Sequence, residues 1–209
     1  LRRFDARLPH VEALVALQPA PARERALAFA YARAGNLERA VGQLANAAQR
    51  YPEDRATYVA LGRLWLQRAG HGGRVEVNKA LEALNTVVGP ESSSEALTLL
   101  GRALILSGDL GRAEQVLQQA TVRFPVEPSA FLYLSRVLES RGRGPAADRA
   151  LLDYAALVPS DTLDAWLLVR IADAHLQLGD HEAARRTLST ALAKDPSNAA
   201  AHALRSKLR

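Results

Sequence analysis

The sequence contains no cysteine, and this absence removes several kinds of function at once. Without thiols the chain forms no disulfide bond, has no thiolate nucleophile and offers no cysteine ligands to zinc or an iron–sulfur cluster. No apolar run approaches the roughly 18 residues that a membrane span requires. The first residues, LRRFDARLPH, also lack the apolar segment of a signal peptide.

Methionine is absent as well, even at position 1. This predicts that the chain is an excerpt or a processed piece of a longer protein. Such a piece can lack its targeting signals, so the sequence indicates no compartment.

Lysine is scarce, because only three of the 27 basic residues are lysine and the others are arginine. The formal net charge of +5 suits an acidic partner or a nucleic acid. The same composition, rich in Arg, Ala, Leu and Gly, is also what GC-rich coding produces without any ligand. Charge alone therefore selects no partner.

Residue patterns for catalysis, metal binding and cofactor binding are missing. The five histidines include no pair four apart on a helix with a carboxylate, and no phosphate-binding Gly-x4-Gly-Lys-Ser/Thr loop occurs. Gly142 and Gly144 stand in a turn with Pro145 and make no dinucleotide fingerprint, which needs a preceding strand. We therefore predict no catalytic residue, no metal and no cofactor, and a protein that is not an enzyme.

What the sequence does contain is a repeat. Four eighteen-residue stretches open with Gly and carry Ala five, Leu nine and Pro seventeen residues later: GNLERAVGQLANAAQRYP (35–52), GDLGRAEQVLQQATVRFP (108–125), GRGPAADRALLDYAALVP (142–159) and GDHEAARRTLSTALAKDP (179–196). Spacing of this kind marks stacked supersecondary units.

Each unit is predicted to hold two helices. An apolar pattern with three- and four-residue spacing precedes each glycine, as at Leu97, Leu100 and Leu104, and indicates an amphipathic helix. Glycine ends that helix in a left-handed conformation, and Asn36, Asp109 or Asp180 follows as a cap for the next one. The second helix has a stripe of Ala and Leu, and proline ends it.

These four aligned copies resemble the tetratricopeptide repeat, a helix–turn–helix unit of 34 residues. The resemblance implies an all-α, right-handed α-solenoid, and we predict a single array over 1–209. Its expected parts are a partial helix at 1–20, repeats at about 21–54, 55–93, 94–127, 128–161 and 165–198, and a capping helix at 199–209. The second repeat departs from the pattern through about five extra residues around 69–80, AGHGGRVEVNKA, where we expect a longer turn.

The resemblance also implies which face of each first helix lines the concave side. Arginine occupies the equivalent place in three successive units, as Arg63, Arg102 and Arg136. The residues predicted for this groove are Arg25, Phe29, Val59, Arg63, Leu66, Thr98, Arg102, Ile105, Leu132, Arg136, Glu139, Trp166, Val169 and Asp173. Guanidinium groups in a row favour a partner with spaced carboxylates. The opposite interpretation is that these arginines are hydrated, or paired with Glu95 and Glu139 on the same face.

The family resemblance favours a non-enzymatic scaffold that binds a protein or peptide, such as a segment of a longer bacterial adaptor. The family's chaperone-tail binders use a clamp of lysines, arginine and asparagines on successive first helices. Here no complete unit has lysine in its first helix and those faces carry no asparagine, which argues against that role. One alternative is an RNA-binding helical repeat, because pentatricopeptide repeats have a similar period. The other is a structural or dimerising segment attached to a catalytic domain elsewhere.

Overall fold

The computed structural model describes residues 8–70 and 73–208, and within them every regular element is a helix. The chain divides into two compact units, Leu1–Asp109 (unit 1) and Leu110–Arg209 (unit 2). The division falls between two helices of the repeat predicted at 94–127. A single array over 1–209 stays a prediction.

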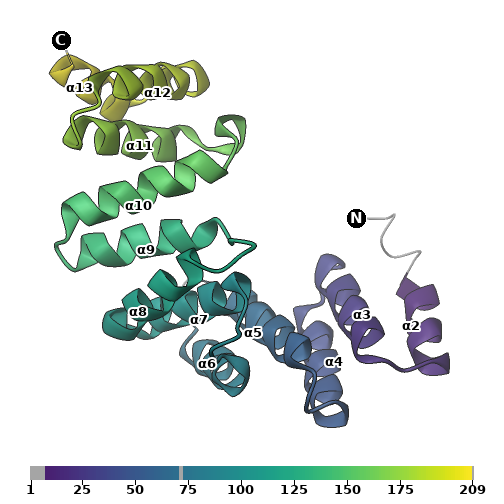
Figure 1. Cartoon of the computed structure of the whole chain (residues 1–209). Coiled ribbons are helices and arrows are strands. Elements are labelled where there is room, and N and C mark those ends of the chain that lie inside the picture. The colour runs from purple at the N-terminus through teal and green to yellow at the C-terminus, as the bar shows by residue number, and fades with distance from the viewer. Residues whose placement is uncertain (1–7, 71–72, 209) are drawn as a thin grey trace. The chain divides into compact units, whose positions relative to one another are not determined.

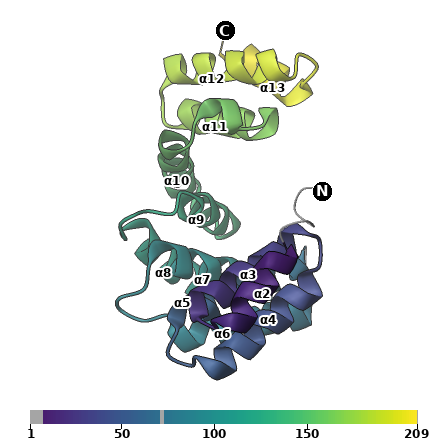
Figure 2. The same cartoon turned by 90° about the vertical axis from the view of Figure 1, so that its right-hand side faces the viewer.

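Unit 1 contains six described helices: α2 (Leu8–Leu17), α3 (Pro21–Arg33), α4 (Leu37–Arg50), α5 (Arg55–Ala69), α6 (Arg74–Val87) and α7 (Ser94–Ser107). Each packs against the next in sequence, and the first helices of the pairs also touch, α3 against α5 and α5 against α7. Figures 1 and 2 show α2, α3 and α4 side by side. The longer turn predicted around 69–80 is wrong for most of its length, because residues 74–80 belong to α6, and residues 71–72 lie outside the described part of the chain.

Unit 2 continues the pattern with α8 (Leu110–Thr121), α9 (Ser129–Ser140), α10 (Gly144–Leu157), a 3-10 turn η1 (Ser160–Thr162), α11 (Ala165–Gln177), α12 (His181–Lys194) and α13 (Ala199–Lys207). Its helices α8 to α12 pack in order of sequence, and α13 contacts both α11 and α12. In Figure 1 helices α9 to α12 follow one another as successive layers. Arg205, Ser206 and Lys207 of α13 are exposed, and the capping role of this helix stays a prediction.

The helix boundaries follow from the residues predicted to set them. Glycines 35, 70, 108, 142 and 179 end first helices with φ between 53° and 88°, a region that only glycine enters at little cost. Asn36 and Asp180 accept hydrogen bonds from the backbone N–H groups of Arg39 and Ala183, at 3.0 and 2.9 Å. Both residues are therefore the N-caps that the sequence predicted.

The core lies where first and second helices meet. The second-helix stripe of small residues and leucine is buried in both units, with Ala40 and Leu44 in α4 and Ala184 and Leu188 in α12 all at most 2% exposed. Small side chains let paired helices approach closely, while leucine fills the space between them. A rigid pair of helices results, with one face of each first helix left for other contacts.

Candidate functional site

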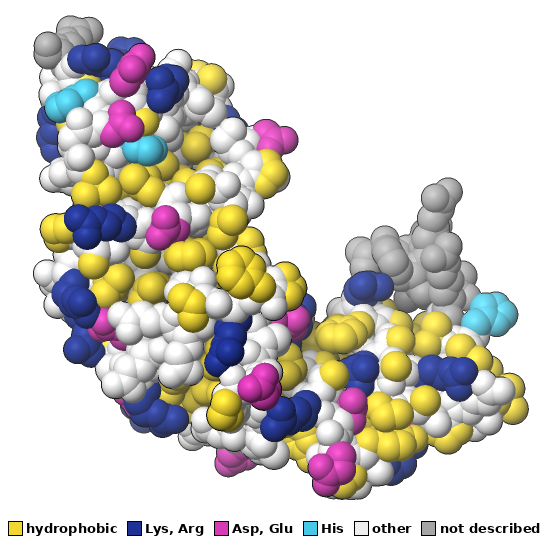
Figure 3. All heavy atoms as spheres, viewed as in Figure 1, with side chains coloured by type: hydrophobic (Ala, Val, Ile, Leu, Met, Phe, Trp, Pro, Cys, Tyr) yellow, Lys and Arg dark blue, Asp and Glu magenta, His cyan; other side chains and the backbone are white. Residues whose placement is uncertain are grey.

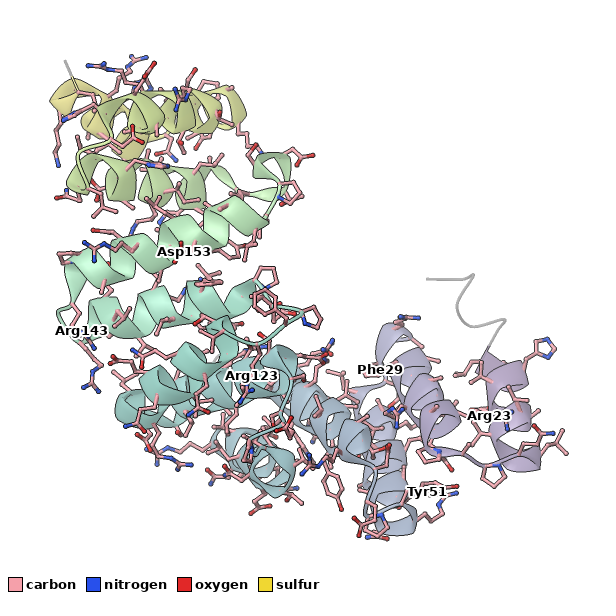
Figure 4. The ribbon with its side chains drawn as sticks, viewed as in Figure 1. Arg23, Phe29, Tyr51, Arg123, Arg143 and Asp153 are labelled. Carbon is pink, nitrogen blue, oxygen red and sulfur yellow. The ribbon has the colours of Figure 1, made fainter. Side chains whose placement is uncertain are left out.

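A hollow of about 500 Å3 lies over the three first helices of unit 1. Helix α5 contacts α3 on one side and α7 on the other, and all three contribute to the lining. The lining residues are Arg25 and Phe29 of α3, Arg55, Ala56, Val59, Ala60 and Arg63 of α5, Val87 of α6, Glu91, Ser92 and Ser93 of the following loop, and Glu95 and Ala96 of α7. Figure 4 labels Phe29 on α3.

Four residues predicted for the groove meet in this hollow: Arg25, Phe29, Val59 and Arg63. They come from α3 and α5, whose proximity was implied only by the stacking of repeats. Sequence reasoning missed Arg55, although it stands four residues before Val59 and eight before Arg63 and so shares their side of the helix. That spacing was the signal that could have found it.

Two arginines of the hollow are already paired with carboxylates. Arg25 forms an ion pair with Asp54, and Asp54 also caps α5 by accepting a hydrogen bond from the backbone N–H of Thr57 at 3.1 Å. Arg63 forms an ion pair with Glu95 of α7. The pairing with Glu95, which the sequence left open, is therefore present in the structure. Figure 3 shows basic, acidic and hydrophobic side chains interspersed on the visible face of unit 1.

Other predicted residues of unit 1 do not reach the hollow. Leu66 has no exposed surface and Thr98 is only 2% exposed, so neither offers a contact to a partner, and the prediction for these two is corrected. The buried hydroxyl of Thr98 needs no outside partner, because it donates a hydrogen bond to the Ser94 carbonyl oxygen at 2.7 Å within its own helix. The half-buried Arg102 donates to the Leu66 carbonyl oxygen at 3.5 Å, and Ile105 lines a separate hollow of about 440 Å3 beside α6.

In unit 2 the predicted residues have mixed surroundings. Arg136 is exposed with its guanidinium carbon 5.9 Å from the centre of the Tyr133 ring, and Trp166 is 58% exposed. Leu132 is half-buried against the core of unit 2, and Val169, at 8% exposure, belongs to that core and offers little to a partner.

Glu139 pairs with Arg170 of α11 at 2.9 Å rather than with Arg136. Burial, reinforced by the negative charge of the half-buried Asp173, raises the pKa of Asp148 on α10. Arg170 thus interacts with acidic side chains of α9 and α10, with Glu139 through an ion pair and with Asp148 through its charge. Because Arg136 lies in unit 2 and Arg63 and Arg102 in unit 1, a row of three arginines stays a prediction.

Neither a metal site nor a membrane helix emerges from the part of the chain that the structure describes. Over residues 8–70 and 73–208, no three His, Asp or Glu side chains come close enough together to hold a metal ion. Within the same ranges no helix combines the length and the apolar character needed to cross a bilayer.

Comparison with known proteins gives three family matches, each described as tetratricopeptide repeat. They cover residues 26–54, 98–162 and 146–208. No sequence among the curated proteins matches the chain.

Solved structures match over nearly the whole chain. The pilF protein of Pseudomonas aeruginosa aligns with a TM-score of 0.80 and 11% identity over 98% of this chain and 90% of its own. YrrB, described as a TPR protein with an unusual peptide-binding site, aligns with a TM-score of 0.64 and 14% identity over 94% of this chain and 97% of its own. A thermophilic TPR protein of Thermus thermophilus, TTC0263, aligns with a TM-score of 0.60 and 21% identity over 90% of this chain and 97% of its own. At these identities the likeness shows the fold, and the all-α solenoid predicted from the repeat is confirmed. Because the repeat matches and the solved structures agree, the chain belongs to the tetratricopeptide repeat family.

Proposed function

We propose that this protein is a non-enzymatic interaction scaffold that presents the first-helix faces of its repeats, and the arginine-bearing hollow of unit 1 above all, to a protein or peptide partner. Tetratricopeptide repeats in general serve protein–protein interaction and are generally non-catalytic. The hollow over α3, α5 and α7 is the single observation that carries the proposal, because it joins an apolar surface to charged groups on a rigid support. The peptide-binding site named for YrrB, which shares the fold, adds support.

The physical advantage of such a surface is preorganisation. The α3, α5 and α7 backbones are held by contacts of α5 with α3 and α7 and by contacts with α4 and α6, and Asp54 holds Arg25 in place. The helix backbones and Arg25 then have little freedom to lose when a partner binds, so more of the contact free energy appears as affinity.

The test is a double charge reversal, Arg63→Glu with Arg102→Glu. Protein captured from native extract by the immobilised wild type should be lost with this variant, because both changes place negative charge on the first-helix faces of unit 1. The matched control is Arg33→Glu with Arg74→Glu, which makes the same change of charge at exposed sites of unit 1 that do not line the hollow.

Quantitative mass spectrometry of the captured proteins compares the three chains, and circular dichroism establishes that each is folded. Equal loss with both double variants would indicate a nonspecific effect of charge. If the Arg63→Glu and Arg102→Glu variant retains every captured protein, the first-helix faces of unit 1 do not bind the partner.

A further inference from the structure

Three residues of the hollow form one inclined row along a single helix. Arg55, Val59 and Arg63 are spaced by four residues on α5, and all three line the hollow. At about 1.5 Å per residue, the two arginines are about 12 Å apart along the helix axis, with Val59 midway between them. Phe29 of α3 adds an aromatic ring to the lining.

The two arginines of this row are accessible to an outside carboxylate. Arg55 is exposed and makes no ion pair with any residue in the described ranges. Arg63 is paired with Glu95, but the two side chains are 47% and 45% exposed. Exposed pairs of this kind contribute little net free energy, so a second carboxylate can replace Glu95 at small cost. Arg25 is less available to an outside carboxylate, because its partner Asp54 is less exposed and also caps α5.

We propose that the hollow of unit 1 binds an extended peptide segment of the form acidic–x–apolar–x–acidic. While the segment is absent, Glu95 forms the ion pair with Arg63 that the segment would otherwise make. The proposal rests on the scaffold function above and names the chemistry of its partner. In an extended chain, residues i, i+2 and i+4 project from one side, and the first and last of them lie about 13 Å apart at 3.3 Å per residue. This length matches the arginine separation, so the two carboxylates meet Arg55 and Arg63 and the central side chain meets Val59.

Charge complementarity also restricts the two intervening residues. Glu91 and Glu95 line the hollow from the side of α7, so carboxylates elsewhere in the segment are repelled. Neutral or basic side chains at the two intervening positions are tolerated, because they project away from the arginines. Because Arg55, Val59 and Arg63 all belong to α5, the segment runs along this one helix rather than across successive repeats.

Two isomeric peptides test this arrangement. Acetyl-Ala-Glu-Lys-Leu-Lys-Glu-Ala-amide places glutamates at the spacing of the two arginines, whereas acetyl-Ala-Lys-Glu-Leu-Glu-Lys-Ala-amide places lysines there with the same composition and net charge. Titrations of the whole chain, followed by NMR chemical shifts, should give a Kd at least about fivefold lower for the first peptide, as expected from charged hydrogen bonds at an exposed site. The shifts should centre on α5 and α7 near the hollow. Equal affinities for the two peptides, or shifts centred elsewhere, would overturn the proposal.

Single substitutions separate the roles of the charges. Glu95→Gln should tighten binding of the first peptide about two- to fivefold, because it removes the internal competitor of an exposed ion pair. Arg55→Gln and Arg63→Gln should each weaken binding about three- to tenfold, while Arg33→Gln, outside the hollow, should leave it unchanged. If Glu95→Gln weakens binding or leaves it unchanged, Glu95 does not compete and the displacement is refuted.

These outcomes are distinguishable from failure of the scaffold function. If neither peptide binds while the Arg63→Glu and Arg102→Glu double variant still loses its captured protein, the partner chemistry proposed here is wrong and the scaffold function stands. If the double variant keeps every captured protein, the scaffold surface itself is wrong, whatever the peptides do.

Discussion

Buried carboxylates and their arginine partners hold helix pairs together at single residues in both units. Glu24 of α3 has no exposed surface, and its Oε1 lies 2.6 Å from Nη1 of the half-exposed Arg50 at the end of α4. Its other oxygen accepts a hydrogen bond from Gln43 of the same helix as Arg50. In unit 2, Glu114 of α8 is only 7% exposed and pairs with Arg141, at 3.0 Å, and with Arg143, labelled in Figure 4. The arginines keep part of their hydration while neutralising carboxylates that lack it.

Removal of Arg50 should therefore destabilise unit 1. We expect Arg50→Ala to lower the free energy of unfolding by about 1–3 kcal/mol, because a buried carboxylate loses its counter-charge while its bond to Gln43 remains. Adding Glu24→Gln should recover part of this loss, since the buried group is then neutral. Urea denaturation followed by circular dichroism measures both changes. A loss below about 0.5 kcal/mol, the usual size of a surface substitution, would contradict the assigned role.

At the scale of helices, the sequence pattern identified the elements better than the role of each position. The equivalent places of Arg63 and Arg136 in their units predicted that these arginines line the groove. In the structure the residues just before these arginines, Gly62 and Ser135, are buried, and a Cβ on Gly62 would lie 2.6–3.0 Å from side-chain atoms of Leu84. Periodicity indicates which positions of a helix face another helix. It does not indicate how closely the two helices approach, because that distance depends on the residues of the partner helix.

Gly62 thus sets the approach of α5 to α6. Gly62→Ala should destabilise the chain by about 1–3 kcal/mol through overpacking against the fully buried Leu84, despite the higher helix propensity of alanine. Gly42→Ala is the matched control, because Gly42 lies inside α4 with no atom within 4 Å of the added Cβ. It should stabilise by about 0.5–1 kcal/mol. Thermal and urea unfolding of the two variants should shift in opposite directions, and equal shifts would contradict the close approach.

The three helices α9, α10 and α11 have an acidic junction that predicts a pH effect. Burial and the charge of Asp173 raise the pKa of Asp148, so the folded state binds a proton there more tightly than the unfolded state does. Stability from this group is present below the ordinary aspartate pKa and is lost as pH rises through the higher folded pKa. Asp148→Asn should therefore raise the unfolding midpoint at pH 7, and the gain should shrink toward pH 3. A gain independent of pH would show that the charge is not its cause.

For the whole molecule, the repeated sequence pattern made the fold predictable. It did not predict equally well which side chains are exposed on the surface. Four copies of one spacing fixed where helices begin and end, because each Gly and Pro acts locally. Whether Arg63 meets solvent, a partner or Glu95 depends on a helix 32 residues further along the chain. The same is true of Leu66, which a repeat template places on the groove but which is fully buried here. Contacts between repeats, and not the repeat pattern itself, decide which side chains are available.

The predicted single array over 1–209 has a consequence for cooperativity. In repeat proteins, stability combines the intrinsic stability of each repeat with coupling between neighbours, so damage in one repeat is felt in others. The two tryptophans, Trp65 in unit 1 and Trp166 in unit 2, report on the two units separately when the other is replaced by phenylalanine. We expect coincident urea transitions from both reporters, and we expect Gly62→Ala in unit 1 to lower the midpoint seen by Trp166 as well as that seen by Trp65. Two separate transitions, with only the Trp65 midpoint lowered, would mean that the chain consists of two independently folding units and that the array is not continuous.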